Sequence, residues 1–212
     1  MHYTFSNTSV SGFDVADLAT GSAVFNSRLQ NGAVVLNNQL LLSASLSQHL
    51  TLDAFTTGQR GLTFSCWFRS SNSGTPARVF DFGNGPSADN IIVEVSNNDL
   101  QVVLYVGGQV KSMNTNVNIN NNVLYHAAWV LSTSGTWIVY LNGMIVAQQS
   151  SMIYPASTPR WLNYIGKSNW GGDPYFNGAI RDFRVYNYNL SSAEVGLLFN
   201  SAEVSMLRKI AS

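Results

Sequence analysis

Residues 62–69 are Leu-Thr-Phe-Ser-Cys-Trp-Phe-Arg, and apolar side chains occupy every second position from Leu62 to Phe68. Alternation with a period of two sends one set of side chains into a core and the other outward, which indicates a β-strand. Cys66 lies on the apolar face, so we interpret it as a core thiol rather than a nucleophile or metal ligand. As the only cysteine, it has no intramolecular disulfide partner and leaves the redox compartment open.

Short β-branched or aromatic runs follow this strand, separated by Gly, Asn and Ser. They cover residues 78–82, 91–95, 100–106, 124–131 and 136–141. Because no helix-length segment lies between them, they predict an antiparallel sandwich rather than a parallel sheet. Asn142-Gly143 suits a type I′ turn and predicts a hairpin over residues 136–147. The Asn-rich stretch 114–122 predicts a polar edge strand or loop.

The C-terminus carries the one clear helix signal. Ser191-Ser192-Ala193-Glu194 fits a capping box, and Val195, Leu197, Leu198 and Phe199 follow it. The sequence Ser-Ala-Glu-Val occurs at 192 and again at 201, which indicates a restart or kink. We therefore expect one domain over residues 1–200 and a helical tail over residues 201–212. Apolar residues at helical spacing suit the tail either for packing on the domain or for docking onto a partner in a homo- or hetero-oligomer: Val204, Leu207 and Ile210.

The charge balance of the 212-residue chain excludes several functions. Only 10% of the residues are charged, against about 25% in an average soluble protein. Eleven basic residues cancel eleven acidic ones, and no Lys/Arg cluster exists, so we expect neither nucleic acid nor an anionic membrane surface as a partner. No apolar run approaches the ~20 residues that a membrane span requires. The sequence shows no classical signal peptide, and we leave the location open, with the cell exterior or a virion surface favoured.

Uncharged polar residues replace the missing charges: the chain has 23 Asn and 26 Ser. These residues favour turns and loops over helices, which agrees with a β-rich fold.

An ordered set of motifs resembles laminin-G-like, concanavalin A-like jelly-roll domains. Residues 164–167, Tyr-Ile-Gly-Lys, and 176–191, Phe-Asn-Gly-Ala-Ile-Arg-Asp-Phe-Arg-Val-Tyr-Asn-Tyr-Asn-Leu-Ser, are similar to the C-terminal signature of that family. The pieces 64–68, 125–128 and 140–146 resemble its upstream strands and hairpin in the same order, and 17–21 weakly resembles its start. The match spans roughly residues 13 to 200, with Leu124 in place of the usual Trp and Arg181 in place of the commoner Asp.

The resemblance implies an all-β, antiparallel two-sheet jelly-roll sandwich with a short C-terminal helix. It does not imply one function, because lectins, adhesion modules, glycosidases and structural domains share this fold.

Catalysis finds little support in the residues. A retaining glycanase needs two carboxylates about 5.5 Å apart, usually delivered by one strand. The chain has only three Glu, and Glu194 and Glu203 lie at apparent helix starts, leaving Glu94. The family pattern places His126 inside a strand, so we interpret it as a structural histidine. We expect no enzyme activity and no zinc site.

Calcium is the cofactor that the loops permit. The resemblance implies that Asp and Asn side chains on loops hold Ca²⁺ in some relatives, and a hard cation prefers such oxygen ligands. The loop over residues 82–90 and the loop over residues 169–175 supply these oxygens. The candidate ligands are Asp89, Asn90 and Asp173, with a structural role in turns as the alternative.

The second loop also carries aromatic residues. Trp170 and Tyr175 bracket a Gly-Gly-Asp-Pro turn. Exposed aromatic rings stack on the apolar face of a sugar, while Asn and Asp side chains bond its hydroxyls. The candidate ligand-binding residues are Asn169, Trp170, Asp173 and Tyr175, and covering the sandwich edge is the alternative for the two aromatic rings. We interpret the other tryptophans as packing residues: Trp67, Trp129, Trp137 and Trp161.

Two functions remain for a non-catalytic sandwich of this kind. The first is a lectin-like recognition module that binds glycans or a protein surface through its loops. The alternative is a structural or assembly protein, such as a capsid-associated or decoration subunit of a large virus. Glycan or surface-ligand recognition is our leading hypothesis, and the low charge, the Asn and Ser content, the missing signal peptide and the apolar tail motivate the alternative.

Overall fold

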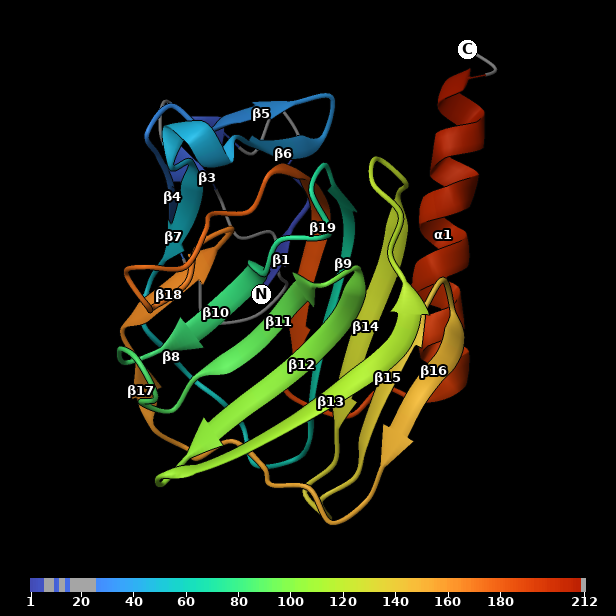
Figure 1. The fold of residues 1–212 in the computed structure, drawn as a ribbon. Coiled ribbons are helices and arrows are strands. Elements are labelled where there is room, and N and C mark those ends of the chain that lie inside the picture. The colour runs from blue at the N-terminus through green and yellow to red at the C-terminus, as the bar shows by residue number, and fades with distance from the viewer. Residues whose placement is uncertain (6–9, 12–13, 16–25, 211–212) are drawn as a thin grey trace.

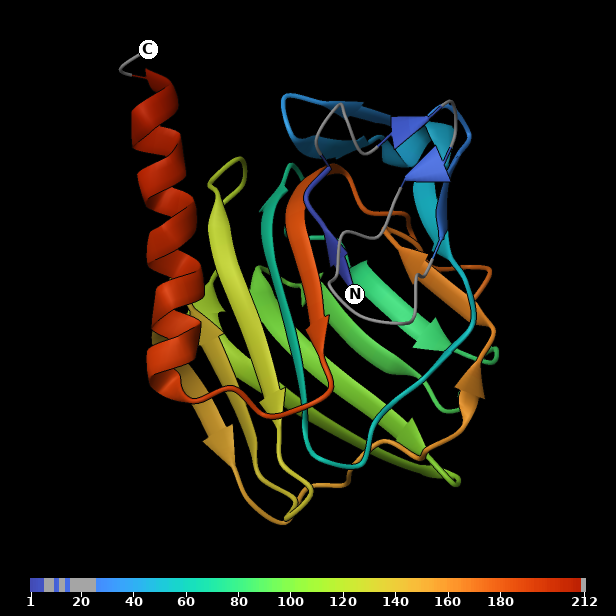
Figure 2. The same ribbon diagram turned by 180° about the vertical axis from the view of Figure 1, so that it is seen from behind.

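A computed structural model describes the backbone of residues 1–5, 10–11, 14–15 and 26–210, and the side chains of residues 1–5 and 26–201. Within these ranges the chain forms two large antiparallel sheets packed face to face, with one long C-terminal helix outside them (Figures 1 and 2). The all-β sandwich with a C-terminal helix that the sequence predicts is confirmed.

The first sheet has eight strands among the described residues, in the order β16-β15-β14-β9-β19-β6-β5, with β1 also paired to β19. Its strands are β1 (His2–Tyr3), β5 (Val34–Leu36), β6 (Gln39–Leu42), β9 (Leu62–Ser70), β14 (Tyr125–Leu131), β15 (Trp137–Leu141), β16 (Met144–Gln149) and β19 (Gly178–Tyr186).

The second sheet has nine described strands, in the order β13-β12-β11-β10-β18-β7-β4-β3-β2. Its strands are β2 (Val10–Ser11), β3 (Asp14–Val15), β4 (Ser27–Gln30), β7 (His49–Leu52), β10 (Ala77–Gly83), β11 (Ile91–Ser96), β12 (Asp99–Val106), β13 (Gln109–Asn118) and β18 (Leu162–Ile165). The remaining elements are the short pair β8 (Phe55–Thr56) and β17 (Pro159–Arg160) and a 3₁₀ turn, η2 (Ala44–Leu46).

The core lies between the two sheets and is built by the alternation of their strands. Leu62, Phe64, Cys66 and Phe68 all belong to it, as predicted from residues 62–69. Burial raises the pKa of the Cys66 thiol to about 12, so the thiol is un-ionised and poorly reactive.

Two predicted details of the strands are also confirmed. Asn142 and Gly143 have φ values of 51° and 78°, the two positive values that a type I′ turn between β15 and β16 requires. The Asn-rich stretch contributes to β13, which lies at the edge of the nine-stranded sheet.

Helix α1 (Ser192–Ile210) begins with the predicted capping box. The backbone N–H and the hydroxyl of Ser191 both donate to Glu194 Oε2 at 2.7 Å, and the Glu194 N–H donates to Ser191 Oγ at 3.3 Å. The helix then runs without a break through residues 200–203, so the predicted restart or kink there is wrong. The sequence Ser-Ala-Glu-Val suits a helix interior as well as a helix start, so its second copy continues the helix instead of starting a new one. Among the described residues no helix is long and apolar enough to cross a membrane.

The first half of α1 packs on the outer face of the eight-stranded sheet. Leu190 and Val195 are buried against Ala128, Val130 and Tyr140 of β14 and β15. The second half projects past the end of the sandwich (Figures 1 and 2). Side chains beyond residue 201 lie outside the described part of the chain, so the docking role predicted for Val204, Leu207 and Ile210 stays a prediction.

Candidate functional site

Two loops predicted to carry function meet on the outer face of the nine-stranded sheet, and Asp81 of β10 joins them. Asn90, from the first loop, donates through Nδ2 to Asp81 Oδ1 at 2.9 Å. The backbone N–H of Asn169, from the second loop, donates to Asp81 Oδ2 at 2.8 Å. Asp81 is fully buried, and burial raises the pKa of its carboxyl although both hydrogen bonds oppose the shift.

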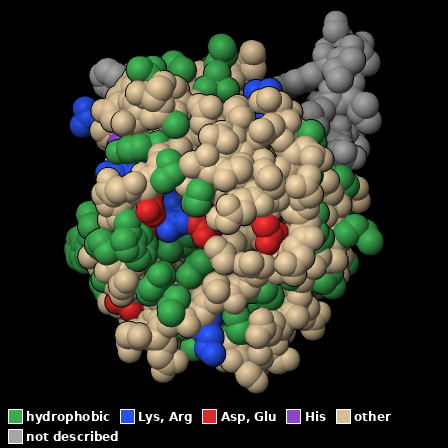
Figure 3. Space-filling model, in the orientation of Figure 1, with side chains coloured by type: hydrophobic (Ala, Val, Ile, Leu, Met, Phe, Trp, Pro, Cys, Tyr) green, Lys and Arg blue, Asp and Glu red, His purple; other side chains and the backbone are tan. Residues whose placement is uncertain are grey.

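A small ion network lies beside this junction. Arg78 of β10 pairs with Glu94 of β11 and, through Nη2, with Asp173 Oδ2 at 3.0 Å. The Ser168 hydroxyl donates to the same Asp173 oxygen at 2.8 Å. Figure 3 shows a cationic side chain between acidic ones on this face. The network fixes the second loop on the sheet and leaves about a third of the Asp173 side chain exposed.

Trp170 lies half-buried over the same network. Its ring centroid is 5.4 Å from that of Tyr105 on β12 and 5.7 Å from the Arg78 guanidinium carbon. The ring therefore lies against the sheet with part of its surface still in contact with solvent.

Tyr175 lies elsewhere on the face. It packs against His49 of β7 with ring centroids 5.6 Å apart, and His49 in turn packs against Tyr164. Strands β11, β10 and β18 separate β7 from β12 in the sheet, so Tyr175 and Trp170 contact different parts of it. Of the four predicted ligand-binding residues, the structure brings together Asn169, Trp170 and Asp173.

The prediction that Trp161 is a packing residue is wrong, because its side chain is 69% exposed. Its neighbours Arg160 and Asn163 are 0% and 1% exposed instead. Arg160 points inward because its guanidinium donates to the Asp89, Ala156 and Thr158 carbonyls, and burial lowers its pKa to about 10.

The backbone of Trp161 is held firmly. Its N–H donates to Asn84 Oδ1 at 3.0 Å, and Asn84 Nδ2 donates to the Pro159 carbonyl at 2.9 Å. The next residue, Leu162, is 40% exposed and accepts a hydrogen bond from Asn169 Nδ2. Figure 3 shows hydrophobic side chains gathered at this edge, over β17 and β18. The backbone next to Trp161 thus contacts the loop that carries Trp170.

We name this continuous surface the Trp161–Trp170 face and define it by six residues: Arg78, Asn84, Trp161, Asn169, Trp170 and Asp173. Sequence reasoning missed Arg78, Asn84 and Trp161. A signal existed near them in Asp81, a charged residue inside the apolar run 79–82, since such a residue needs buried partners.

The three metal candidates contact different groups. The Asp89 carbonyl accepts from Arg160, Asn90 bonds Asp81, and Asp173 bonds Arg78 and Ser168. In the part of the chain that the structure describes, no group of three or more His, Cys, Asp or Glu side chains could hold a metal. Two buried amide oxygens nevertheless lack a hydrogen-bond partner beside Asp81, those of Asn90 and Asn169.

His126 is a structural residue of β14, as predicted. It is 1% exposed, and its Nε2 is hydrogen-bonded to Ser65 Oγ at 2.9 Å. Burial lowers its pKa to about 4. Glu94, the one Glu that the sequence places away from the helix starts, pairs with Arg78 and is 6% exposed.

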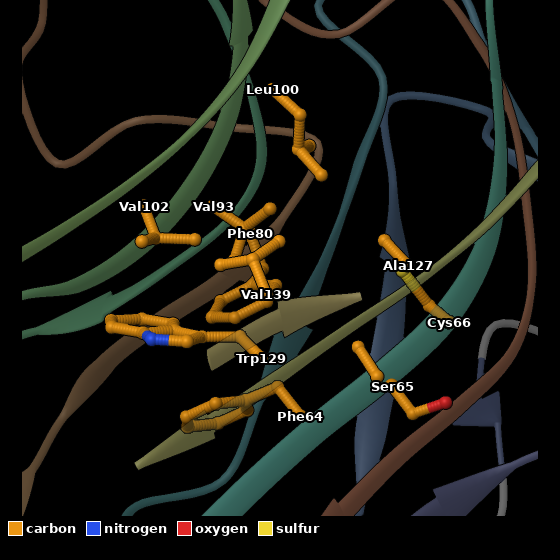
Figure 4. Close-up of a pocket in the computed structure, with 11 residues that line it drawn as sticks. Phe64, Ser65, Cys66, Phe80, Val93, Leu100, Val102, Ala127, Trp129 and Val139 are labelled. Atoms are coloured by element: carbon orange, nitrogen blue, oxygen red, sulfur yellow. The ribbon is translucent and has the colours of Figure 1, made fainter. Parts of the chain in front are cut away.

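A small cavity lies between the sheets, away from the Trp161–Trp170 face (Figure 4). Apolar side chains of β9 to β12, β14 and β15 line it, among them Phe80, Val102 and Trp129. A lining of this kind offers no hydrogen bonds to a saccharide, so the cavity belongs to the packing of the core.

A sandwich of two antiparallel sheets with this strand order has the architecture of a concanavalin A-like jelly-roll protein. The chain belongs to the concanavalin A-like lectin/glucanases superfamily, whose laminin-G model matches residues 43–196. A search of the curated proteins by sequence finds no significant match.

Solved structures of bacterial toxin binding domains share the fold. The receptor binding domain of botulinum neurotoxin D has a TM-score of 0.69 at 13% identity, over 95% of this chain and 52% of that one. The binding domain of Paraclostridial Mosquitocidal Protein 1 gives 0.64 at 15%, over 92% and 51%. The binding domain of botulinum neurotoxin DC in complex with SialylT gives 0.64 at 16%, over 88% and 48%. This chain spans about half the length of each, and the likeness shows the fold.

Proposed function

We propose that this protein is a non-catalytic recognition module that binds a saccharide on the Trp161–Trp170 face. The observation that carries the proposal is the Trp161 indole, 69% exposed on a backbone fixed by the Asn84 side chain. An exposed tryptophan forgoes the free energy of burial, and one that forms an apolar patch with the exposed Leu162 on a fixed backbone suggests a binding role. A flat aromatic ring held in this way suits stacking on a sugar ring.

The polar groups around Trp161 suit hydroxyl recognition. Asn84, Asn169 and Asp173 offer amide and carboxylate groups within the same face, and Arg78 offers a fixed guanidinium. The two carboxylates of Glu94 and Asp173 outweigh the single positive charge of Arg78, which favours a neutral saccharide over an anionic one on this face. The lectins of the superfamily and the toxin binding domains of the same fold support this class of function.

A glycan array with purified full-length protein tests the proposal. Trp161→Ala and Trp170→Ala should each reduce binding at least tenfold, whereas Tyr188→Ala should not. Tyr188 is a matched control because it is aromatic, 47% exposed and packed on Tyr186 of another surface. Unfolding midpoints confirm that each variant is folded. No binding by folded protein, or equal losses in all three variants, would contradict a saccharide site here.

We also propose that Ca²⁺ supports this face by binding oxygens of Asp81, Asn90 and Asn169. The unpartnered buried amide oxygens beside a buried carboxylate are ligands that a hard cation prefers. This set replaces Asp89 and Asp173 of the sequence prediction and keeps Asn90. Calcium chloride should raise the unfolding midpoint relative to chelator in the parent, and Asp81→Asn should abolish that difference. An equal midpoint with calcium and with chelator in the parent would refute the site.

An assembly function is a second candidate because α1 extends past the sandwich (Figure 1). If the tail docks onto a partner or a second copy, deleting residues 201–212 should abolish association in sedimentation experiments, while Trp170→Ala should leave it intact. A monomeric parent protein that assembles with nothing and binds a glycan would favour the recognition module alone.

A further inference from the structure

The side chains of His126, Trp67 and Arg181 lie in one row across three adjacent strands, on the outer face of the eight-stranded sheet and opposite the Trp161–Trp170 face. We call this row the Arg181–Trp67 rung. Strands β14, β9 and β19 are adjacent, and their registers pair His126 with Trp67 and Trp67 with Arg181. The Arg181 guanidinium carbon lies 4.5 Å from the Trp67 ring centroid. Figure 2 shows the three strands side by side, with α1 next to β14.

Helix α1 closes the rung from outside. The Phe199 ring stacks on Trp67 with centroids 5.5 Å apart and lies 6.0 Å from the His126 ring. Trp67 is 3% exposed and His126 is 1% exposed. Arg181 is half-buried and lies on β19, on the side of the rung away from α1.

Four buried nitrogen atoms of this rung lack hydrogen-bond partners among the described residues. Trp67 Nε1, His126 Nδ1, and Nε and Nη2 of Arg181 are all buried with no hydrogen bond in the described part of the chain. Folded proteins seldom leave buried N–H groups unpaired, since each forfeits its hydration. Several such groups on a single rung therefore point to an acceptor that binds there.

Among the described residues no carboxylate forms an ion pair with Arg181, although the charge of Asp182 acts on it at longer range. The nearest acid, Asp182, accepts hydrogen bonds from Arg184 at 2.9 Å through both Nε and Nη2, and one from His2 at 2.7 Å. Arg184 and His2 therefore occupy this carboxylate. Burial lowers the pKa of Arg181, because keeping the charged guanidinium away from water costs free energy.

We propose that the Arg181–Trp67 rung is a binding site for a small oxyanion, a carboxylate, sulfate or phosphate group. Nε and Nη2 form one edge of the guanidinium and can donate side by side to two oxygens of such a group. Trp67 Nε1 supplies a third donor. Because these atoms are covered, the anion enters when the side chain of Phe199 or Arg181 moves aside. The site is independent of saccharide binding on the opposite face.

Titration of the ¹⁵N-labelled full chain tests this site. The probes are sodium phosphate, sodium sulfate and sodium acetate, each at constant ionic strength and pH, and the readout is the Trp67 indole N–H resonance, assigned with Trp67→Phe. We expect a saturable shift with at least one probe. Arg181→Gln should weaken binding at least tenfold, and Arg181→Lys should weaken it less, since Lys keeps the charge but lacks the planar edge.

Arg60→Gln is the matched control, because it removes one charge from an exposed position elsewhere and should leave the titration unchanged. Phe199→Ala should strengthen binding severalfold by opening the rung. No saturable shift with any probe, or an identical shift in folded Arg181→Gln, would overturn the proposal.

The source of the oxyanion is distinguished by two further probes, N-acetylneuraminic acid and a sulfated monosaccharide. Tighter binding of either than of acetate or sulfate would support the rung as a site for an acidic saccharide. Equal or weaker binding would support a site for the free ion.

Discussion

At the scale of single residues, Gly178 shows why the Phe-x-Gly motif at 176–178 matters. Its φ is 148°, and a Cβ there would lie 1.9 Å from the carbonyl oxygen of Arg69 on β9. A backbone oxygen cannot move aside without breaking the pairing of β19 with β9. Gly178→Ala should therefore lower the free energy of unfolding by about 3 kcal/mol in urea denaturation.

Gly171 provides the control for that measurement. A Cβ added to it meets nothing within 4 Å, and Gly171→Ala should change stability by no more than about 0.5 kcal/mol. Equal effects of the two substitutions would show that Gly178 is not constrained by the close approach of β9.

The buried His126 predicts how stability depends on pH. Burial lowers its folded pKa to about 4, with opposing charge effects from Asp182 and from Arg184 and Arg181. The unfolded chain takes up the proton near pH 6.5 and the folded chain only near pH 4. The free energy of unfolding should therefore fall by roughly 3 kcal/mol as the pH drops through this window.

Urea denaturation of the parent and of His126→Gln between pH 4 and pH 7.5 measures how the free energy of unfolding depends on pH. The variant should lose most of this dependence and keep a smaller part, because burial also lowers the pKa of His49. An unchanged slope in the variant would assign the acid sensitivity to other groups.

Residue-level inference from the sequence succeeded where side-chain type and burial agree, and failed where they conflict. Cys66 alternates with apolar neighbours and is buried, as predicted. Trp161 and Arg160 exchange the burial that their chemistry suggests, because the Asp89 carbonyl and the Thr57 hydroxyl, both far away in the sequence, accept hydrogen bonds from the guanidinium. Contacts between segments distant in the sequence decided this exchange, and no local pattern records them.

At the scale of elements, the capping box of α1 makes a testable contribution. Ser191 accepts from the Glu194 N–H, one of the donors that the first helical turn leaves free. Ser191→Ala should lower the free energy of unfolding by about 1 kcal/mol in urea denaturation. Asn is equally suited to this position, so Ser191→Asn should be nearly as stable as the parent. If neither variant differed from the parent, the cap would not contribute to the free energy of unfolding.

The long strands were predictable because five to nine residues rich in apolar, β-branched and aromatic side chains give a recognisable signal. Strands of two to four residues, such as β5, β6 and β18, carry too few positions for a period to appear. The helix was found from its cap, but its continuity through residues 200–203 was not, since a second cap-like sequence inside a helix is locally indistinguishable from a start.

At the scale of the whole molecule, the first and the last strand of the described fold pair with each other. His2 and Tyr3 of β1 pair with Arg184 and Phe183 of β19, and Tyr3 is fully buried. Tyr3→Ala should cost about 3–5 kcal/mol, typical of a large aromatic residue removed from a core. His2→Ala, which removes one bond to Asp182 from a partly exposed position, should cost clearly less by the same denaturation measurement. Comparable losses in the two variants would show that the burial of Tyr3 is not what holds β1 against β19.

The overall sandwich followed from the order of the motifs, but the arrangement of its surfaces did not. Asn169, Trp170 and Asp173 were predicted together and lie together, since one short loop holds them. Arg78 and Asn84 joined them only through the pairing of β10 with its neighbours, and Trp67 met Arg181 only through the register of β9 with β19. Register across a sheet depends on the complete set of strands.

The two layers of the sandwich have a geometric consequence. The Trp161–Trp170 face and the Arg181–Trp67 rung belong to different sheets and point in opposite directions, with only the thickness of the two layers between them. Ligands on both would not compete for space. One molecule would then cross-link two surfaces, and the strength of that cross-link would multiply with the number of copies engaged rather than follow from either affinity alone.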